Sequence, residues 1–316
     1  MNAAASTVAR EAADLSGEEL RAAILAFTQN LSMEVTPKIV NDFLTVKDVL
    51  KPGTEIYVSS VPGQPHTELV EAAKALRDNG FTAVPHVTAR SFADAAALDT
   101  CLSALAGEAG VTQTLLIAGD QDKPTGPFHS TLQLLETGLF DKHGIRKMGI
   151  GGHPEKHPRV AADVLRQAIV DKAAFAERTD AEMYVISQVC FEADAIETWA
   201  TSIRAAGVTL PVRAGLAGPA KLKSLLTFAV ICGVGNSMRA LKRQGRSLTK
   251  MLSVADPNEL VVQLATHNAG ITPPIMGAHL FSFGGAARTA KWIHTVQTGK
   301  FDLNADKSGF TVSTDT

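Results

Sequence analysis

Short runs of apolar residues alternate along this chain with longer stretches in which apolar positions recur every three or four residues. Short apolar runs bounded by polar or glycine positions are typical of strands buried in a parallel sheet. The longer stretches have the spacing of a helix that buries one face. The pattern predicts eight strands, at residues 31–35, 56–60, 82–88, 114–119, 147–151, 183–188, 210–214 and 278–283.

Helices are predicted between successive strands and after the last one. Some end at a glycine stop signal, such as Asn79-Gly80. A further helix precedes the first strand, because Leu20, Ile24 and Phe27 recur at helical spacing. The helices between and after the strands are predicted at residues 38–50, 67–79, 92–109, 131–142, 159–177, 194–206, a helical region from 220 to about 268, and 286–298.

Eight strands that alternate with helices predict an α/β protein with a single (β/α)8 TIM barrel and an extra N-terminal helix. An open doubly wound sheet is the alternative, but no G-x-G-x-x-G sequence follows the first strand. No linker rich in Pro, Gly or Ser divides the chain. We therefore expect a helical extension at 1–30, the barrel at 31–303 and a loose polar C-terminal tail at 304–316.

The overall composition narrows the class of protein. The 316 residues are 45% hydrophobic and 20% charged, as in an ordinary globular protein, and the formal net charge of −2 favours neither nucleic acid nor an anionic membrane as a partner. No run approaches the about 18 apolar residues that span a bilayer, and the first residues lack the pattern of a signal peptide. Cys101, Cys190 and Cys232 are widely spaced, which favours a reducing compartment, and we expect a cytoplasmic protein.

Polar side chains recur at or just after the ends of the predicted strands, where barrels of this type place their active sites. Each has a purely structural alternative: Glu34 as a buried ion-pair partner, Asp120 as a turn residue, His86 as a core histidine. Their recurrence at several strand ends favours a site. The residues are Glu34, Ser59, Ser60, His86, Thr88, Gly119, Asp120, Gln188, His279, Phe281 and Phe283.

The fifth strand leads into the densest group of such residues, Gly151-Gly-His-Pro-Glu-Lys-His-Pro158. Proline fixes φ, so this loop is stiff and holds its side chains in defined directions. His153 and His157 are candidate metal ligands for a metal-dependent barrel hydrolase. However, Pro154 breaks the helical i,i+4 geometry that an H-E-x-x-H site needs.

Five segments, in order, resemble the methylenetetrahydrofolate reductase family of (β/α)8 barrels. They are Ser32-Met-Glu-Val-Thr-Pro37, Pro85-His-Val-Thr88, Ile117-Ala-Gly-Asp120, Gly151-Gly-His-Pro-Glu-Lys-His-Pro158 and Ile186-Ser-Gln188. The resemblance covers roughly residues 31 to 292. It implies reduction of 5,10-methylenetetrahydrofolate to 5-methyltetrahydrofolate with NADH or NADPH, usually through bound FAD.

The resemblance also implies roles for individual residues. Glu34 would be the general acid at folate N10, which requires a carboxyl group shielded enough to stay protonated near neutral pH. Asp120 would face the pterin and stabilise the cationic iminium formed on ring opening, and Gln188 would bind the same pterin edge. Phe281 is a further substrate-binding candidate. Family members often associate, so a homo-oligomer is an expectation by analogy.

The positions implied for the cofactor depart from the family pattern. The family's Thr-Tyr-Gly-Ala after strand two is Ser59-Ser-Val-Pro-Gly63 here, its arginine two residues before the aspartate is Ala118, and its Tyr-Ala pair is Phe128-His129. The family's tyrosine before the Pro-Glu is His153, and its lysine corresponds to Lys172 only across an insertion. The candidate cofactor-binding residues are Ser59, His86, Gly119, His153, His157, Asp163 and Lys172.

Two interpretations of the cofactor site follow. The chain binds FAD through altered contacts, or it passes hydride directly between NAD(P)H and the folate. The physiological direction is also open, because the same site could oxidise 5-methyltetrahydrofolate. Basic residues at 239–250 are interpreted as one solvated helix face, with a polyglutamate tail or a cofactor phosphate as the alternative partner.

Overall fold

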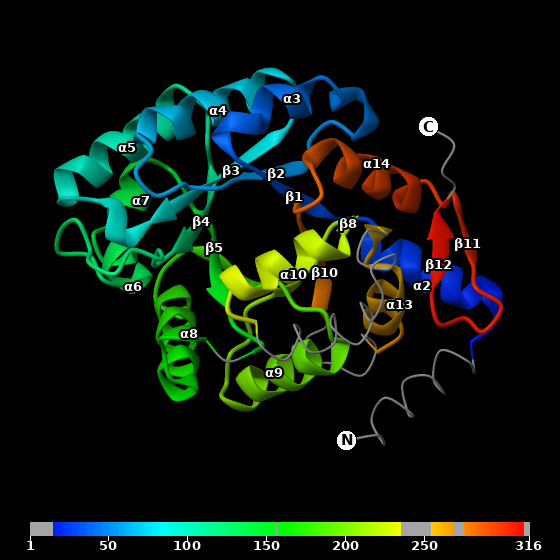
Figure 1. Ribbon diagram of the computed structural model, residues 1–316. Coiled ribbons are helices and arrows are strands. Elements are labelled where there is room, and N and C mark those ends of the chain that lie inside the picture. The colour runs from blue at the N-terminus through cyan, green and yellow to red at the C-terminus, as the bar shows by residue number, and fades with distance from the viewer. Residues whose placement is uncertain (1–14, 156, 235–253, 268–274, 313–316) are drawn as a thin grey trace.

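In the computed structural model, eight parallel strands close into a barrel, which confirms the predicted fold class (Figure 1). The structure describes residues 15–155, 157–234, 254–267 and 275–312. Around the barrel the strand order is β1-β10-β7-β6-β5-β4-β3-β2. The strands are β1 (Ser32–Val35), β2 (Glu55–Val58), β3 (Thr82–Thr88), β4 (Gln113–Ile117), β5 (Lys147–Gly152), β6 (Glu182–Ser187), β7 (Val212–Ala217) and β10 (Ile275–Phe281).

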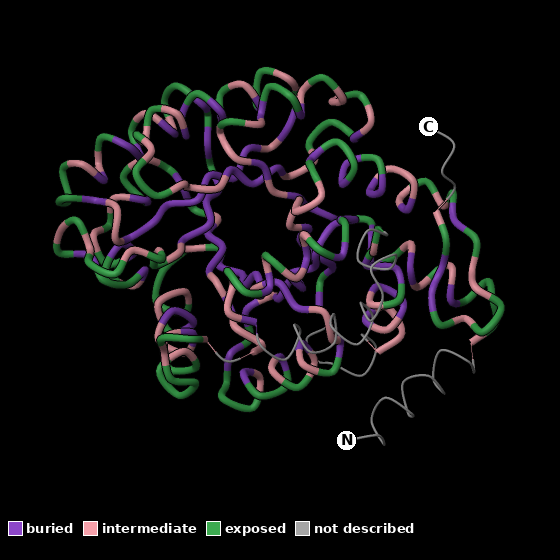
Figure 2. The backbone as a smooth tube through the Cα atoms, viewed as in Figure 1, coloured by how far each residue is buried: buried purple, intermediate pink, exposed green. Residues whose placement is uncertain are grey.

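Helices surround the strands, and the buried backbone lies in the ring that the strands form (Figure 2). No helix in the described part of the chain is long and apolar enough to cross a membrane. The helices are α2 (Gly17–Thr28), α3 (Val40–Leu44), α4 (His66–Asp78), α5 (Ala95–Gly107), α6 (Thr131–Leu135), α7 (Leu139–Lys142), α8 (Ala162–Glu177), α9 (Ala193–Ala205), α10 (Leu222–Ile231), α13 (Asn258–His267) and α14 (Ala286–Gln297), with 3-10 turns η1 (Pro37–Ile39), η2 (Lys47–Val49) and η3 (Ala89–Ser91).

Three of the predicted helices are interrupted. The helix expected at 38–50 consists of η1, α3 and η2, and the one expected at 131–142 divides into α6 and α7 at Gly138, whose φ is 70°. The helical region expected from 220 to about 268 begins with the two-residue strand β8 (Ala220–Lys221), which pairs with β9 (Val254–Ala255). The basic residues at 239–250 lie outside the described residues.

The predicted N-terminal helix is present as α2. Ser16 and Glu19 cap it reciprocally: Ser16 Oγ accepts from the Glu19 N–H at 3.2 Å, and Glu19 Oε2 accepts from the Ser16 N–H at 2.8 Å. Leu20 and Ile24 are fully buried and join the main core, to which α13 and α14 also contribute. Helix α2 therefore packs against the barrel next to β10.

The inside of the barrel holds its own small core of aromatic and aliphatic side chains. Tyr57 and Tyr184 meet across it with their hydroxyl groups 2.7 Å apart, and Val84, Leu115 and Ile186 pack around them. A Cβ at Gly149 would lie 2.7 Å from the Tyr184 ring, so a glycine is needed on β5 to leave space for that ring.

At the N-terminal end of the barrel, Glu55 receives two cations. Lys147 Nζ donates to Glu55 Oε1 at 2.9 Å, and Arg213 Nη1 donates to Glu55 Oε2. The guanidinium of Arg213 also lies over the Tyr184 ring, 5.5 Å from its centroid. Three strands, β2, β5 and β7, are therefore tied together below the aromatic layer.

The loose tail expected at 304–316 is wrong for its first part. Strands β11 (Phe301–Leu303) and β12 (Phe310–Val312) pair in an antiparallel hairpin, and Phe310 is buried against Phe301 and Trp292. The polar composition of this segment did not indicate a buried element, but the contacts of Phe310 with Phe301 and Trp292 bury it. Asn258 of α13 connects the parts, because its Nδ2 donates to Phe310 O at 2.8 Å and its Oδ1 accepts from Trp292 Nε1 at 2.8 Å.

Replacement of the buried Asn258 by Leu tests this arrangement. Asn258→Leu leaves the Trp292 N–H and the Phe310 carbonyl without partners, so we expect it to lower the free energy of unfolding by about 2–4 kcal/mol, measured by urea denaturation. Asn41→Leu, at an exposed position of α3, is the control and should change it by less than about 0.5 kcal/mol. Equal stability of the two variants would show that the hairpin does not depend on Asn258.

Candidate active site

Glu34 lies at the C-terminal mouth of the barrel, on the inward face of β1. Side chains alternate along a strand, so Ser32 and Glu34 share this face while Met33 and Val35 pack outward in the main core. The Glu34 side chain is 20% exposed. Two histidines approach its Oε2: His86 Nε2 of β3 at 3.6 Å, and His279 Nε2 of the neighbouring strand β10 at 3.9 Å.

This environment is more polar than the sequence led us to expect. Burial raises the pKa of Glu34, but His279, His86 and the Ser59 hydroxyl, which lie close to the carboxylate, together hold that pKa below its ordinary value. The expectation of a carboxyl group kept protonated by apolar neighbours is therefore wrong for the protein without substrate. Polar side chains that the strand pattern placed separately converge on this carboxylate.

His86, which lies beside Glu34, is uncharged at neutral pH. Burial, opposed by the Glu34 carboxylate and helped by His279, lowers the pKa of His86 to about 4. The ring is thus neutral at neutral pH. Its Nε2 is buried and has no hydrogen-bond partner, and the same is true of His279 Nε2. Both nitrogens lie within 4 Å of Glu34 Oε2.

Asp120 lies on the rim of the mouth, after β4, and its side chain is 90% exposed. Arg159 holds this loop in place: its guanidinium lies 3.5 Å from Asp120 Oδ1, donates to Asp120 O at 3.1 Å and pairs with Asp122 at 2.8 Å. Arg159 thus neutralises part of the charge on Asp120.

The two histidines of the fifth loop come together beside Asp120. The rings of His153 and His157 meet edge to face, with centroids 5.2 Å apart. Burial lowers the pKa of His153 to about 4, helped by His157 and Lys172 and opposed by Asp120. Burial also lowers the pKa of His157, with Asp120 again acting in the opposite direction. Within the described ranges, no group of three or more His, Cys, Asp or Glu side chains is arranged to hold a metal ion.

The C-terminal end of α10 brings Cys232 to the same opening. Burial, together with the charges of Glu34 and Asp120, raises the pKa of the Cys232 thiol to about 11. A Cβ at Gly233 would lie 2.7 Å from Pro158, so this end of the helix lies against the fifth loop. Cys232 is thus a further side chain that is influenced by both Glu34 and Asp120.

An aromatic wall follows β10 from the mouth to α10. His279 contacts Phe281 edge to face, Phe281 stacks near Phe283, and Phe283 stacks on Phe228 of α10 with centroids 4.1 Å apart. A Cβ at Gly215 would lie 2.9 Å from the Phe281 ring, so β7 leaves room for it. Phe281, predicted as a substrate-binding residue, thus lines the mouth.

Gln188 follows β6 on the rim. Its side-chain Oε1 accepts from the Val189 N–H at 2.8 Å, and its backbone N–H donates to Gly152 O at 2.7 Å. Because the carboxamide oxygen is engaged, the NH2 group is the part of the side chain that can meet a ligand.

Of the candidate cofactor positions, His153, His157 and Lys172 lie near one another, whereas Asp163 lies apart from Lys172. Asp163 and Lys172 are nine residues apart on α8, which at about 100° per residue places them half a turn apart around the helix. Asp163 is exposed, whereas Lys172 is buried and burial lowers its pKa to about 8. Ser59 Oγ donates to Val35 O at 3.3 Å. Gly119, with φ of +99°, lies so close to Thr88 that a Cβ would meet Thr88 Cγ2 at 2.4 Å.

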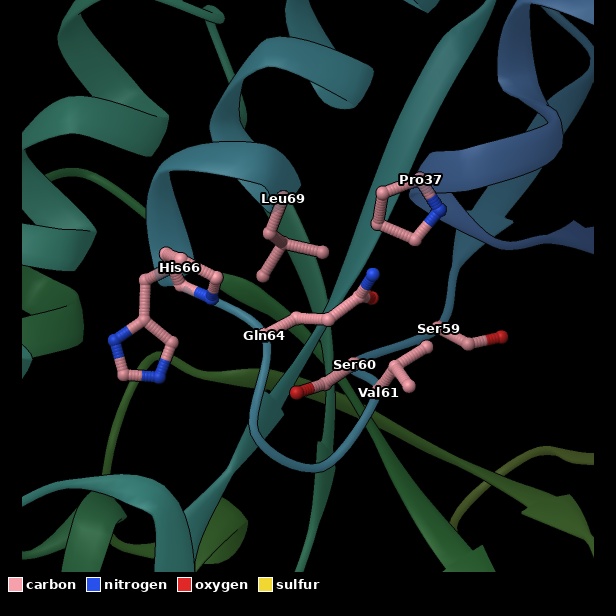
Figure 3. A pocket seen from close by; sticks show the side chains of 8 residues that line it. Pro37, Ser59, Ser60, Val61, Gln64, His66 and Leu69 are labelled. Atoms are coloured by element: carbon pink, nitrogen blue, oxygen red, sulfur yellow. The ribbon is translucent and has the colours of Figure 1, made fainter.

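The loop after β2, where the family pattern differs, folds around its own small pocket (Figure 3). In Figure 3 the Gln64 side chain lies across this pocket between Leu69 and Ser59, while the Ser60 hydroxyl points toward His66. Gln64 Oε1 is buried without a hydrogen-bond partner. Phe128, which the sequence placed beside the cofactor, is instead buried in the main core.

Comparison with known proteins supports the family suggested by the sequence motifs. Residues 55–243 match the family model described as "Methylenetetrahydrofolate reductase". Among solved structures, a xylose isomerase domain containing protein of Salmonella typhimurium LT2 is 14% identical, with a TM-score of 0.43 over 84% of this chain and 94% of that chain. D-psicose 3-epimerase is 13% identical, with a TM-score of 0.42 over 83% and 90%. At this identity, the names of those two proteins say nothing about the chemistry of this chain.

Sequence reasoning missed several residues that the structure brings to the site. Arg159 and Cys232 come from distant segments, and no local pattern pairs either with Asp120. Ser32 could have been predicted from the sequence, because it lies two positions before Glu34 and side chains two positions apart on a strand share one face. Arg213 lies on β7, where no polar side chain had been singled out.

The low pKa of His86 predicts a pH dependence of stability. An unfolded histidine has a pKa of about 6.5, so the unfolded state binds more protons between that pH and about 4, and stability falls as the pH falls through this window. The free energy of unfolding of wild type and His86→Gln would be measured by urea denaturation at pH 7 and at pH 4. Between these two pH values, the wild type should lose on the order of 3 kcal/mol more unfolding free energy than His86→Gln loses. His129→Gln, at an exposed position, is the control; parallel pH profiles for wild type and His86→Gln would contradict the buried neutral ring.

Proposed function

The chain belongs to the methylenetetrahydrofolate reductase family, and we propose that it reduces 5,10-methylenetetrahydrofolate to 5-methyltetrahydrofolate with NADH or NADPH as hydride donor. The observation that carries this proposal is the position of Glu34, a single carboxyl group held inside the barrel mouth and facing the opening between two histidines. A residue that served only to bind folate would not need a carboxyl group in such a shielded place.

In the proposed reaction, the Glu34 carboxyl group gives a proton to N10 and the bond between N10 and the bridging methylene carbon breaks. The product is an N5-methylene iminium cation. A hydride from NAD(P)H then adds to the methylene carbon, which gives the N5-methyl group and NAD(P)+, and the Glu34 carboxylate regains its proton from water. General acid catalysis of this kind contributes about 10²–10⁴-fold to rate.

The low pKa of Glu34 in the free protein sets a condition on this step. Of the influences on this carboxyl group, burial is the one that favours its protonated form. A pterin ring that covers the mouth would remove the remaining 20% exposure of the side chain and strengthen that influence. We therefore propose that Glu34 takes up its proton as folate binds.

Asp120 and Gln188 would bind and stabilise the folate. Asp120 supplies negative charge at the rim. Because its side chain is 90% exposed in the free protein, bound folate would have to shield it from water before this charge could stabilise the cationic iminium strongly. The Arg159 partner would have to give up part of its contact with Asp120 for this charge to act fully. The Gln188 NH2 group would donate to an acceptor on the pterin edge.

The residues at the expected flavin positions do not fit a bound flavin. Asp163 and Lys172 face opposite sides of α8, and His86 faces Glu34. We therefore propose direct hydride transfer from NAD(P)H to the iminium, since this reduction does not intrinsically require a flavin.

Glu34→Gln tests the assignment of the acid. We expect kcat for NAD(P)H oxidation coupled to 5-methyltetrahydrofolate formation to fall at least about 100-fold, because the amide cannot protonate N10. The dissociation constant of folate, measured by calorimetry, should change by no more than a few fold. Glu136→Gln, an exposed carboxylate at the end of α6, should leave both quantities unchanged. A Glu34→Gln protein with near wild-type turnover would contradict the proposed role.

A further inference from the structure

A line of polar contacts runs along the inside of the barrel from its N-terminal end to Glu34. Arg213 Nη1 donates to Ser32 Oγ at 3.4 Å, and Ser32 Oγ lies 3.0 Å from His279 Nδ1. The other nitrogen of the ring, His279 Nε2, faces Glu34 Oε2 at 3.9 Å. Ser32 and His279 are register partners on the neighbouring strands β1 and β10, so the sheet itself sets this contact.

The chemistry of these groups fixes where the hydrogens lie. Arginine is always a donor, so Ser32 Oγ accepts from Arg213. Ser32 is fully buried, and among the described residues the acceptor within reach of its hydroxyl hydrogen is His279 Nδ1. If Nδ1 carried a hydrogen, the serine hydroxyl would be left without an acceptor in a dry interior, at a cost of about 1–3 kcal/mol.

The opposite side of the ring leads to the same assignment. With the hydrogen on Nδ1, the Nε2 lone pair would face the Glu34 carboxylate across a buried gap, and the two would repel. With the hydrogen on Nε2, an N–H points at the carboxylate. Both sides of the ring thus favour one tautomer.

We propose that Arg213 and Ser32 are positioning residues that hold His279 as its neutral Nε2–H tautomer, with this N–H directed at the catalytic carboxyl group of Glu34. The tautomer assignment follows from the contacts alone, whereas its catalytic meaning rests on the proposed function. His279 would stabilise the carboxylate that remains after Glu34 has given its proton to N10.

The line of contacts from Arg213 through Ser32 and His279 to Glu34, called the relay below, is held in place by surrounding side chains. Arg213 is paired with Glu55 and lies over Tyr184, and the His279 ring is held between Tyr57 and Phe281 with centroids 4.5 and 5.1 Å away. The other groups that face Glu34 are His86 from β3, the Ser59 hydroxyl from the loop after β2, and Cys232 from α10. His279 differs from these groups because Ser32, inside the barrel, hydrogen-bonds to its ring.

The direct test is the tautomer itself. Long-range ¹H–¹⁵N NMR of histidine-labelled protein at pH 7 distinguishes the two tautomers and the imidazolium, and His279→Gln identifies the His279 signals among the nine histidines. We expect the Nε2–H form in wild type and a mixture of tautomers in Ser32→Ala. The Nδ1–H form or an imidazolium in wild type would overturn the proposal, even if Ser32→Ala failed to fold.

Kinetics tests the catalytic meaning separately. In Ser32→Ala the falling alkaline limb of the kcat profile should move up by about one pH unit, because loss of a charge-assisted donor raises the pKa of Glu34. We expect kcat to fall about tenfold with KM for folate nearly unchanged, and Ser32→Thr to restore both. Thr114→Val, which removes a buried hydroxyl without a partner from the outer face of β4, is the matched control.

The outcomes separate the two proposals. A wild-type protein with no reductase activity but with the Nε2–H tautomer would refute the proposed function and leave the relay standing. An active wild type whose pH profile and tautomer are unchanged in Ser32→Ala would refute the relay and leave the function standing.

Discussion

The structure of the site depends on the cost of placing one carboxylate inside a protein barrel. Glu34 is largely removed from water, and a buried carboxylate is tolerated only where donors or opposite charge face it. His279, His86 and the Ser59 hydroxyl provide this compensation from three different strands or loops. The compensation is incomplete, because both Nε2 atoms are without hydrogen-bond partners. The carboxylate is therefore stabilised by nearby polar groups without being fully hydrogen-bonded, which leaves it able to interact with a substrate.

The rest of the barrel holds these groups in place. Below the carboxylate lie the paired Tyr57 and Tyr184, and below them the Glu55 ion pairs with Lys147 and Arg213. Glycines on β5 and β7 leave space for the larger rings. The rim carries the more exposed groups, which the substrate can displace or reorder. In this account, the rigid groups around Glu34 inside the barrel serve acid catalysis, and the more exposed groups at the rim serve substrate binding.

Much of the fold could be predicted from the sequence, because each barrel strand is a short apolar run and β3 spans the predicted 82–88. The positions of Glu34, His86 and Phe281 at the mouth also followed from strand ends. The environment of Glu34 could not be predicted, since it depends on register: Ser32 meets His279 only because β1 pairs with β10. The hairpin after residue 300 was missed for a similar reason, because it is held by packing against Trp292 and by a hydrogen bond from Asn258, contacts that its own polar composition does not show.

The most direct test of the account is the fate of deuterium from NAD(P)H labelled at C4. The purified protein, shown by its visible absorption to contain no flavin, would be mixed with 5,10-methylenetetrahydrofolate in ordinary water, and the 5-methyltetrahydrofolate analysed by mass spectrometry. The account predicts one deuterium in the methyl group of the product, delivered by direct transfer. Product formed only after FAD is added, or no product at all, would contradict it.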